Sequence, residues 1–269
     1  MTFAIIHFSM KKKVVIIIVS SIVGALALSI AIPFTILGIR TASLKADYSY
    51  LKEDSVYKEK VEVVGLELVT QHVSCGYASI EMISSYYGNP VTEDELDERN
   101  GAISTASTNG FLNEINRSIP SKTFVKRSYL KHDQLLKEVH DSLKNNNPVA
   151  IEWAAKDKNE WTLHFSVVSG LDLANDNVTV YNPYGYIENV TTKEFISRTT
   201  FNAYKNMPLF LNFGFAFGAF HKNTIFYATQ LLDNSLWASS KIIALFGDSA
   251  VKAANCSIIY IKNLLGFDC

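Results

Sequence analysis

The chain has 269 residues, which is the size of one domain or at most two. Residues 1–40 hold only basic charges, and the 21 basic and 26 acidic residues after them argue against a nucleic-acid-binding protein. With 48% hydrophobic residues the chain is not disordered, and three cysteines exclude a disulfide-dense scaffold and a four-cysteine zinc site.

The N-terminal segment is the most apolar part of the chain. Residues 14–39 contain no ionisable side chain, and they are bounded by Lys11–Lys13 and by Arg40. As a helix this run is roughly 39 Å long, which exceeds the ~30 Å hydrocarbon core of a bilayer. The lysine triplet predicts a cytoplasmic N-terminus at residues 1–13, a transmembrane anchor at 14–39 and a C-terminal part outside the cytoplasm.

A cleaved signal peptide is the alternative interpretation of this segment. Its apolar core would span about 7–15 residues and would end in small residues at a cleavage site. The run in this chain is longer, and Thr41–Ser43 is only a weak cleavage candidate. The anchor is therefore the preferred prediction, and secretion after signal cleavage is the alternative.

The next segments predict a linker at residues 40–60 and a domain at 61–228 that begins with helices. The linker is polar and unpatterned, and Val61–Val69 alternates loosely as a short strand. Apolar residues at helical spacing then predict four helices. These begin at Cys75, at Thr92 with a capping box to Glu95, at Gly110 and at Asp133.

The second half of this domain changes to strand patterns. Short β-branched or aromatic runs predict strands at Val149–Trp153, Thr162–Ser169 and Val178–Tyr181. The alternating aromatic residues of Phe210–Phe220 predict a further strand. Helices followed by strands indicate an α+β fold rather than a wound parallel sheet. Residues 229–269 carry apolar residues at helical intervals and predict one or two amphipathic helices.

Three features of the domain favour thiol chemistry. Cys75 stands at a predicted helix N-terminus, which can lower a cysteine pKa from about 8.5 to well below 7.5. His164 lies in a predicted strand and would carry the proton to the leaving group. Asn182 ends the next strand and would fix the histidine tautomer, while Gln71 and the Cys75 backbone N–H would stabilise an oxyanion.

The sequence around these residues resembles a known family. Gln71–Gly88 is Q-H-V-S-C-G-Y-A-S-I-E-M-I-S-S-Y-Y-G, and His164–Gly185 contains H-F-S-V-V-S-G and V-T-V-Y-N-P-Y-G. Both blocks are similar to the bacteriocin-processing cysteine peptidases of the papain clan, and the resemblance extends over about residues 66–203.

The resemblance implies a papain-like fold, here preceded by one transmembrane helix, in which N-terminal helices pack on an antiparallel sheet. It also implies that Cys75 is the nucleophile, His164 the base, Asn182 the residue that orients the histidine and Gln71 the oxyanion donor. Two positions depart from the family pattern. The family usually has Asp where Asn182 stands, and its glutamine lies further from the cysteine than Gln71 does.

The remaining candidate residues are given no chemical role. His72 is interpreted as structural, and Cys256 and Cys269 could pair with each other if the domain is exported. No cofactor and no metal site are expected, because three further histidines have no partner at metal-ligand spacing: His132, His140 and His221.

The sequence therefore predicts a membrane-anchored, outward-facing cysteine peptidase that hydrolyses peptide bonds in peptide or protein substrates. A thiol acyltransferase or amidase is an alternative, because passing a thioester to an amine requires the same thiolate and oxyanion hole. A catalytically inactive module that binds peptides or a partner is a second alternative, which the departures at Asn182 and Gln71 leave open.

Overall fold

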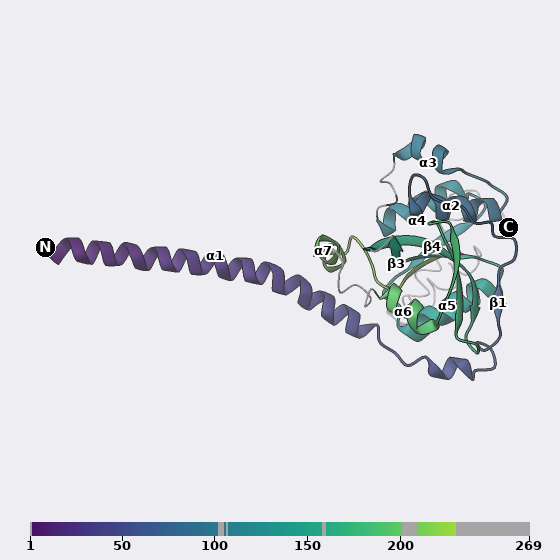
Figure 1. Cartoon of the computed structure of the whole chain (residues 1–269), viewed down its shortest axis with the longest axis horizontal. Coiled ribbons are helices and arrows are strands. Elements are labelled where there is room, and N and C mark those ends of the chain that lie inside the picture. Colours follow the sequence, from purple (N-terminus) through teal and green to yellow (C-terminus); the bar gives the residue numbers. More distant parts are fainter. Residues whose placement is uncertain (1, 102–104, 106, 158–159, 201–208, 230–269) are drawn as a thin grey trace, which may run out of the picture.

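The computed structural model describes residues 2–101, 105, 107–157, 160–200 and 209–229. Helix α1 (Thr2–Ser43) projects away from the rest of the chain (Figure 1). Its portion Lys13–Ser43 is, within the residues described, the one helix long and apolar enough to cross a membrane. The side chains of residues 13–32 are all exposed, because no other described part of the chain packs against them.

Beyond α1 the helices come first and most of the strands follow, which confirms the predicted α+β class. The helical elements are η1 (Ser49–Lys52), α2 (Cys75–Tyr86), α3 (Glu93–Asn100), α4 (Thr108–Ser118), α5 (His132–Lys144), α6 (Thr192–Thr199) and α7 (Leu209–Phe217). The strands are β1 (Val61–Glu62), β2 (Thr123–Arg127), β3 (Val149–Asp157), β4 (Glu160–Asp172), β5 (Asn177–Asn182), β6 (Tyr186–Val190) and β7 (Thr224–Thr229).

The strands form one sheet in the order β2-β7-β3-β4-β5-β6, and β1 pairs with β4. Every pairing is antiparallel. The pairing of β4 with β5 begins at Val167 and Tyr181, so the part of β4 before Val167 has an edge that β5 does not cover. This open edge lies beside the end of β5, where Asn182 is located.

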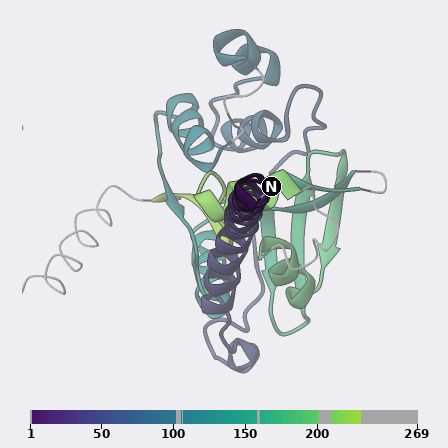
Figure 2. The same cartoon turned by 90° about the vertical axis from the view of Figure 1, so that its left-hand side faces the viewer.

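Helices cover both faces of the sheet. On one face, α2, α3 and α4 pack against strand residues such as Phe165 and Phe226. On the other face, α5 and α6 pack against strand residues such as Trp153 and Val168. Figure 2, in which α1 points toward the viewer, shows α2, α3 and α4 together above the sheet. Neighbouring residues of β4 thus face different helices, because side chains alternate along a strand.

Several predicted elements begin at or near the residues that the capping and strand patterns of the sequence indicate. Helix α2 starts at Cys75 because the Ser74 hydroxyl accepts the Tyr77 N–H, which is an N-cap bond. Helix α3 starts after Thr92, and the predicted capping box with Glu95 is present. The predicted strands beginning near residues 149, 162 and 178 are the central strands β3, β4 and β5.

The prediction of a strand at Phe210–Phe220 is wrong, because Leu209–Phe217 is helix α7. In this segment apolar residues occur on every side, so alternation of phenylalanines does not distinguish a strand from a helix. Helical geometry stacks Phe213 and Phe217, which are four residues apart, with ring centroids 6.2 Å apart. Gly214 lies against the Phe220 ring, where a Cβ atom would come within 2.6 Å of Phe220 Cδ2.

Other predicted boundaries also changed. The predicted strand at Val61–Val69 is only Val61–Glu62, and the N-cap of α5 is Lys131 rather than Asp133, which lies in the first turn. Five elements were not predicted: η1, β2, β6, α6 and β7. The predicted C-terminal helices and the Cys256–Cys269 pair lie outside the described residues.

Candidate active site

The loop before Cys75 is held by one buried carboxylate. Glu93, the first residue of α3, is 0% exposed. Its Oε2 atom accepts the backbone N–H groups of Val73 at 2.9 Å and Ser74 at 3.0 Å, and its Oε1 accepts that of His72 at 3.2 Å. Hydrogen bonds to a charged acceptor are stronger than neutral ones. The position of Cys75 is therefore fixed by α3 as well as by its own helix.

His164 and Asn182 lie side by side on neighbouring strands. The His164 Nε2 atom is 2.9 Å from Asn182 Oδ1. Asn182 Nδ2 donates to Glu188 Oε1 at 2.8 Å, and a carboxylate accepts only, so the amide nitrogen must face Glu188. The amide oxygen then faces the imidazole, and His164 Nε2 must carry the proton. The Nδ1 atom is consequently the basic nitrogen of the ring.

Glu188 is itself held by a buried arginine. Arg198, which is 3% exposed, binds both carboxylate oxygens of Glu188, at 2.7 Å and 3.1 Å. Its Nε atom donates to the Ala154 carbonyl at 2.6 Å, and its guanidinium lies 3.4 Å from the centre of the Trp153 ring. A chain of contacts thus leads from Arg198 through Glu188 and Asn182 to the imidazole.

Tyr184 covers the imidazole. Its ring is stacked on that of His164, with centroids 4.1 Å apart and planes 20° apart. Its backbone N–H also donates to Asn182 Oδ1 at 3.0 Å. Tyr184 therefore shields the bond between His164 and Asn182, and His164 is only 1% exposed.

Gln71 lies next to these residues through its backbone. Its N–H donates to the Pro183 carbonyl at 2.8 Å, and Pro183 follows Asn182 directly. The side-chain oxygen Oε1 is buried and has no hydrogen-bond partner in the part of the chain that is described. The four predicted site residues thus come from two regions of the sequence that meet at the end of β5.

The Cys75 sulfur lies beside β4, the strand that carries His164. The N–H of Phe165 hydrogen bonds to the Cys75 sulfur from the α2 side. The His164 ring lies against Asn182 and Tyr184. Within the described residues no hydrogen bond joins the sulfur to the ring. The thiol is thus tied to the residue that directly follows His164 in β4.

The pKa values of Cys75 and His164 do not favour the thiolate that the sequence predicts. Burial raises the pKa of the Cys75 thiol to about 11 and outweighs the lowering by N–H groups of Phe165, Gly76 and Cys75 itself. Burial also lowers the pKa of His164 to about 3, with Arg198 acting in the same direction and the Asn182 bond opposing it. The helix N-terminus does favour a thiolate, but desolvation is the larger effect. Both shifts favour the neutral forms, a thiol at Cys75 and an imidazole at His164.

Glu152 is a further buried acid that the sequence did not single out. It is 0% exposed on β3, directly across from Phe165. Burial raises its pKa to about 8, and its Oε1 atom has no partner among the residues described. Its negative charge, when present, raises the pKa of Cys75. A neutral Glu152 therefore favours the thiolate more than an ionised one does.

The side chain of His72 points away from the Cys75–His164 pair. His72 contacts Asp94 at 2.8 Å, a bond that raises the His72 pKa, and it lies on the surface. Within the described ranges no three His, Cys, Asp or Glu side chains are grouped as metal ligands.

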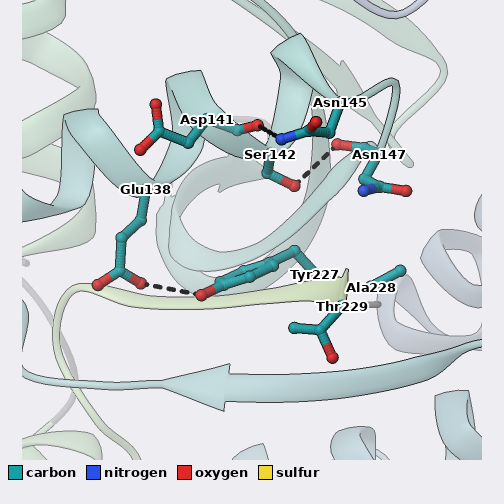
Figure 3. Close-up of a pocket in the computed structure, with 8 residues that line it drawn as sticks. All are labelled: Glu138, Asp141, Ser142, Asn145, Asn147, Tyr227, Ala228 and Thr229. Carbon is teal, nitrogen blue, oxygen red and sulfur yellow. Dashed lines mark hydrogen bonds between the residues drawn. The ribbon is translucent and has the colours of Figure 1, made fainter. Parts of the chain in front are cut away.

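The hollow in Figure 3 lies away from these residues. It has a volume of about 300 Å³ and lies between α5 and β7. Tyr227 at its base donates to Glu138 at 3.3 Å. Since neither Cys75 nor His164 lines it, it provides no substrate cleft for them.

Comparisons with known proteins give one family match. A model described as the Peptidase_C39 like family matches residues 63–208. Among solved structures, the chain is similar to a double glycine motif protease from an AMS/PCAT transporter, crystallised in complex with the leader peptide. The identity is 14% and the TM-score 0.41, over 63% of this chain and 99% of that chain. A comparison with curated proteins gave no match.

The matched region contains all four predicted site residues and both blocks on which the resemblance rests. It covers more than half of the chain. The prediction of the family is thereby confirmed. The chain belongs to the Peptidase_C39 like family.

Proposed function

We propose that the chain is a membrane-anchored cysteine peptidase in which Cys75 attacks the substrate carbonyl and His164 transfers the proton. The strongest support is the 2.9 Å bond between His164 Nε2 and Asn182 Oδ1. Because Glu188 fixes the direction of the Asn182 amide, the ring is kept in the tautomer whose Nδ1 is basic. The Cys75 sulfur is held beside the same strand by the N–H of Phe165.

The proposed reaction starts from the neutral pair. The Cys75 sulfur attacks the peptide carbonyl carbon while its proton passes to His164 Nδ1. The tetrahedral intermediate collapses, the C–N bond breaks, and the imidazolium gives its proton to the departing amine. Water then attacks the thioester with Nδ1 again as the base, which releases the acid and restores the thiol. The Asn182 oxygen stabilises the imidazolium in both steps.

Two groups are suited to stabilise the oxyanion. The backbone N–H of Cys75 stands in the first turn of α2, where N–H groups have no intrahelical partner. Gln71 is tied to Pro183 through its backbone, and its side-chain oxygen has no partner in the described part of the chain. We assign its amide N–H as the second donor.

The anchor is proposed from α1. Its segment Lys13–Ser43 meets the length and composition of a membrane span, and Lys11–Lys13 favour a cytoplasmic N-terminus. The domain that follows then lies outside the cytoplasm. Its substrates are peptides or proteins accessible at that surface.

The test uses the full chain in phosphatidylcholine/phosphatidylglycerol nanodiscs with a library of peptides that carry a fluorogenic coumarin amide. Cys75→Ala should reduce cleavage to background, and His164→Ala should lower kcat by about 10²–10⁴-fold, as removal of a general base does. His132→Ala is the matched control, because His132 lies on α5 and outside the site.

Two outcomes would count against the proposal. Cleavage by Cys75→Ala at the wild-type rate would exclude this nucleophile. If the folded wild-type chain cleaved no library member, the catalytically inactive module would be favoured instead.

A further inference from the structure

Helix α7 has an unusual composition for a helix at the surface. The segment Leu209–Phe220 is L-F-L-N-F-G-F-A-F-G-A-F, and Asn212 is its one hydrogen-bonding side chain. A helix that is apolar on all sides is normally buried in a core or in a membrane. In this structure Phe217 is 74% exposed, and Leu211 and Phe213 are only partly buried.

The exposed side of α7 continues the surface of α1. Phe213 packs edge-on against Phe34 of α1, with ring centroids 6.0 Å apart. Phe217 is stacked on Phe213 at 6.2 Å. An aromatic row thus runs from the apolar surface of α1 outward along α7. Figure 1 shows α7 on the side of the domain from which α1 projects.

Two basic side chains hold α1 against α7 and the domain, near the C-terminal end of α1. Arg40 of α1 donates to the Tyr129 hydroxyl at 3.2 Å and to the carbonyls of Phe215 and Ala216 at 3.5 Å and 3.4 Å. Lys222 donates to the Thr41 hydroxyl at 3.0 Å. Arg40 is half-buried and suits the headgroup region of a bilayer, whereas Lys222 is only 7% exposed and holds α1 on the domain.

The contact with α1 sets the depth of α7. At ~1.5 Å per residue, a hydrocarbon core of ~30 Å takes about 20 residues, which from Val14 extend to about Pro33. The headgroup zone adds roughly 5–7 Å on each side, which corresponds to about four more residues. Phe34, the partner of Phe213, therefore lies at the boundary between acyl chains and headgroups.

We propose that α7 is a second membrane contact, an interfacial helix whose exposed aromatic row is covered by lipid at the acyl–headgroup boundary. The inference rests on the proposed anchor, because α1 supplies the depth. Burial of apolar side chains holds a helix in the interface, and Arg40 next to α7 is placed to interact with the headgroups. Burial of Phe217 in lipid removes an apolar side chain from water.

The opposite side of α7 connects the membrane to the candidate site. Phe215 packs on Phe220 at 5.4 Å and forms a buried cluster with Ala154. Trp161 and Leu163 of β4 pack against the same cluster, and His164 follows Leu163. The strand that carries the imidazole is thus packed on the membrane-facing helix, so this part of the domain faces the bilayer.

The experiment places a nitroxide at one position at a time in the full chain, after Cys75, Cys256 and Cys269 are changed to serine, in phosphatidylcholine/phosphatidylglycerol nanodiscs. Collision with oxygen and with a polar nickel complex reports depth. A label at Phe217→Cys should show a several-fold higher ratio of oxygen to nickel collisions than one at Val64→Cys. Val64 is 85% exposed and provides the aqueous control, and Ile22→Cys in the span reports on the anchor.

Each result decides the inference. A water-like Phe217 label beside a lipid-like Ile22 label would overturn it while leaving the anchor intact, whereas water-like labels at both would overturn both. Spin–spin broadening at Phe217 with little access to either reagent would mean that a second copy covers α7, which would also overturn it. If the cysteine-free chain does not fold, Phe217→Trp with native cysteines should gain a fluorescence component that brominated lipid quenches, and absence of quenching would contradict the proposal.

Discussion

The neighbouring Glu188 explains why position 182 carries asparagine rather than aspartate. Its Nδ2 donates to Glu188 Oε1 at 2.8 Å, and Glu188 is paired with the buried Arg198. An aspartate, the residue usual in the family, would bring a second carboxylate to this position. Two carboxylates at about 3 Å cannot both remain ionised. The neutral amide is therefore the partner that fits Glu188, and it leaves His164 as a neutral base.

This explanation predicts a reciprocal pair of substitutions. Asn182→Asp should lower kcat/KM by about tenfold or more, equivalent to ~1.4 kcal/mol, because repulsion from Glu188 raises the pKa of the new acid. Adding Glu188→Gln restores a donor toward the introduced aspartate and keeps the net charge, so the double variant should recover most of the activity. Steady-state kinetics of the single and double variants provide the measurement, and a double variant no better than Asn182→Asp would contradict the explanation.

The neutral state of Cys75 has a direct kinetic consequence. With a pKa of about 11, the thiolate fraction rises with pH throughout the neutral range. Alkylation of Cys75 by iodoacetamide should therefore become about tenfold faster per pH unit between roughly pH 7 and pH 9. Mass spectrometry of the Cys75 peptide measures this rate. A plateau near neutral pH would instead indicate a preformed thiolate–imidazolium pair.

At the scale of elements, α3 positions the start of α2. The carboxylate of Glu93 accepts three backbone N–H groups from the loop that precedes Cys75. The loop carries Gln71, whose own N–H is bound to Pro183 on the other side of the site. One buried side chain thus fixes the separation between the nucleophile helix and the end of β5.

Removal of that side chain should affect both stability and catalysis. Glu93→Ala leaves buried N–H groups without partners, which should cost about 1–3 kcal/mol and lower kcat/KM by displacing Cys75. Glu95→Ala in the same helix removes only an exposed capping contact and is the control. Thermal unfolding and peptide cleavage measure the two effects, and equal behaviour of the two variants would count against the role of Glu93.

The sequence predicted the helix starts and strands that depend on capping residues and local spacing. The start of α2, the capping box of α3 and strands β3, β4 and β5 follow from spacing and capping within a few residues. Contacts between distant segments were not predictable in this way, and they include Glu93 on the Cys75 loop, Tyr184 on His164 and Arg198 on Glu188. Helix α7 was misassigned because its apolar residues carry no period that distinguishes a helix from a strand, and its packing against α1 and β4 joins distant segments.

For the whole molecule, these contacts orient the domain relative to the anchor. α1 enters the domain beside α7, and α7 packs on the strand that carries His164. Helix α2 brings the Cys75 sulfur to the same strand, where it accepts the Phe165 N–H. The proposed chemistry depends on the sulfur and the imidazole meeting at the open edge of β4.

The most direct measurement is identification of the acylated residue. The full chain in nanodiscs is mixed with a cleaved coumarin peptide, quenched in acid within a single turnover, and digested for mass spectrometry. We expect the substrate acyl group as a thioester on Cys75, accumulating in wild type and absent from His164→Ala on the same time scale. An acyl group on another residue, or equal acylation of Cys75 without His164, would contradict it.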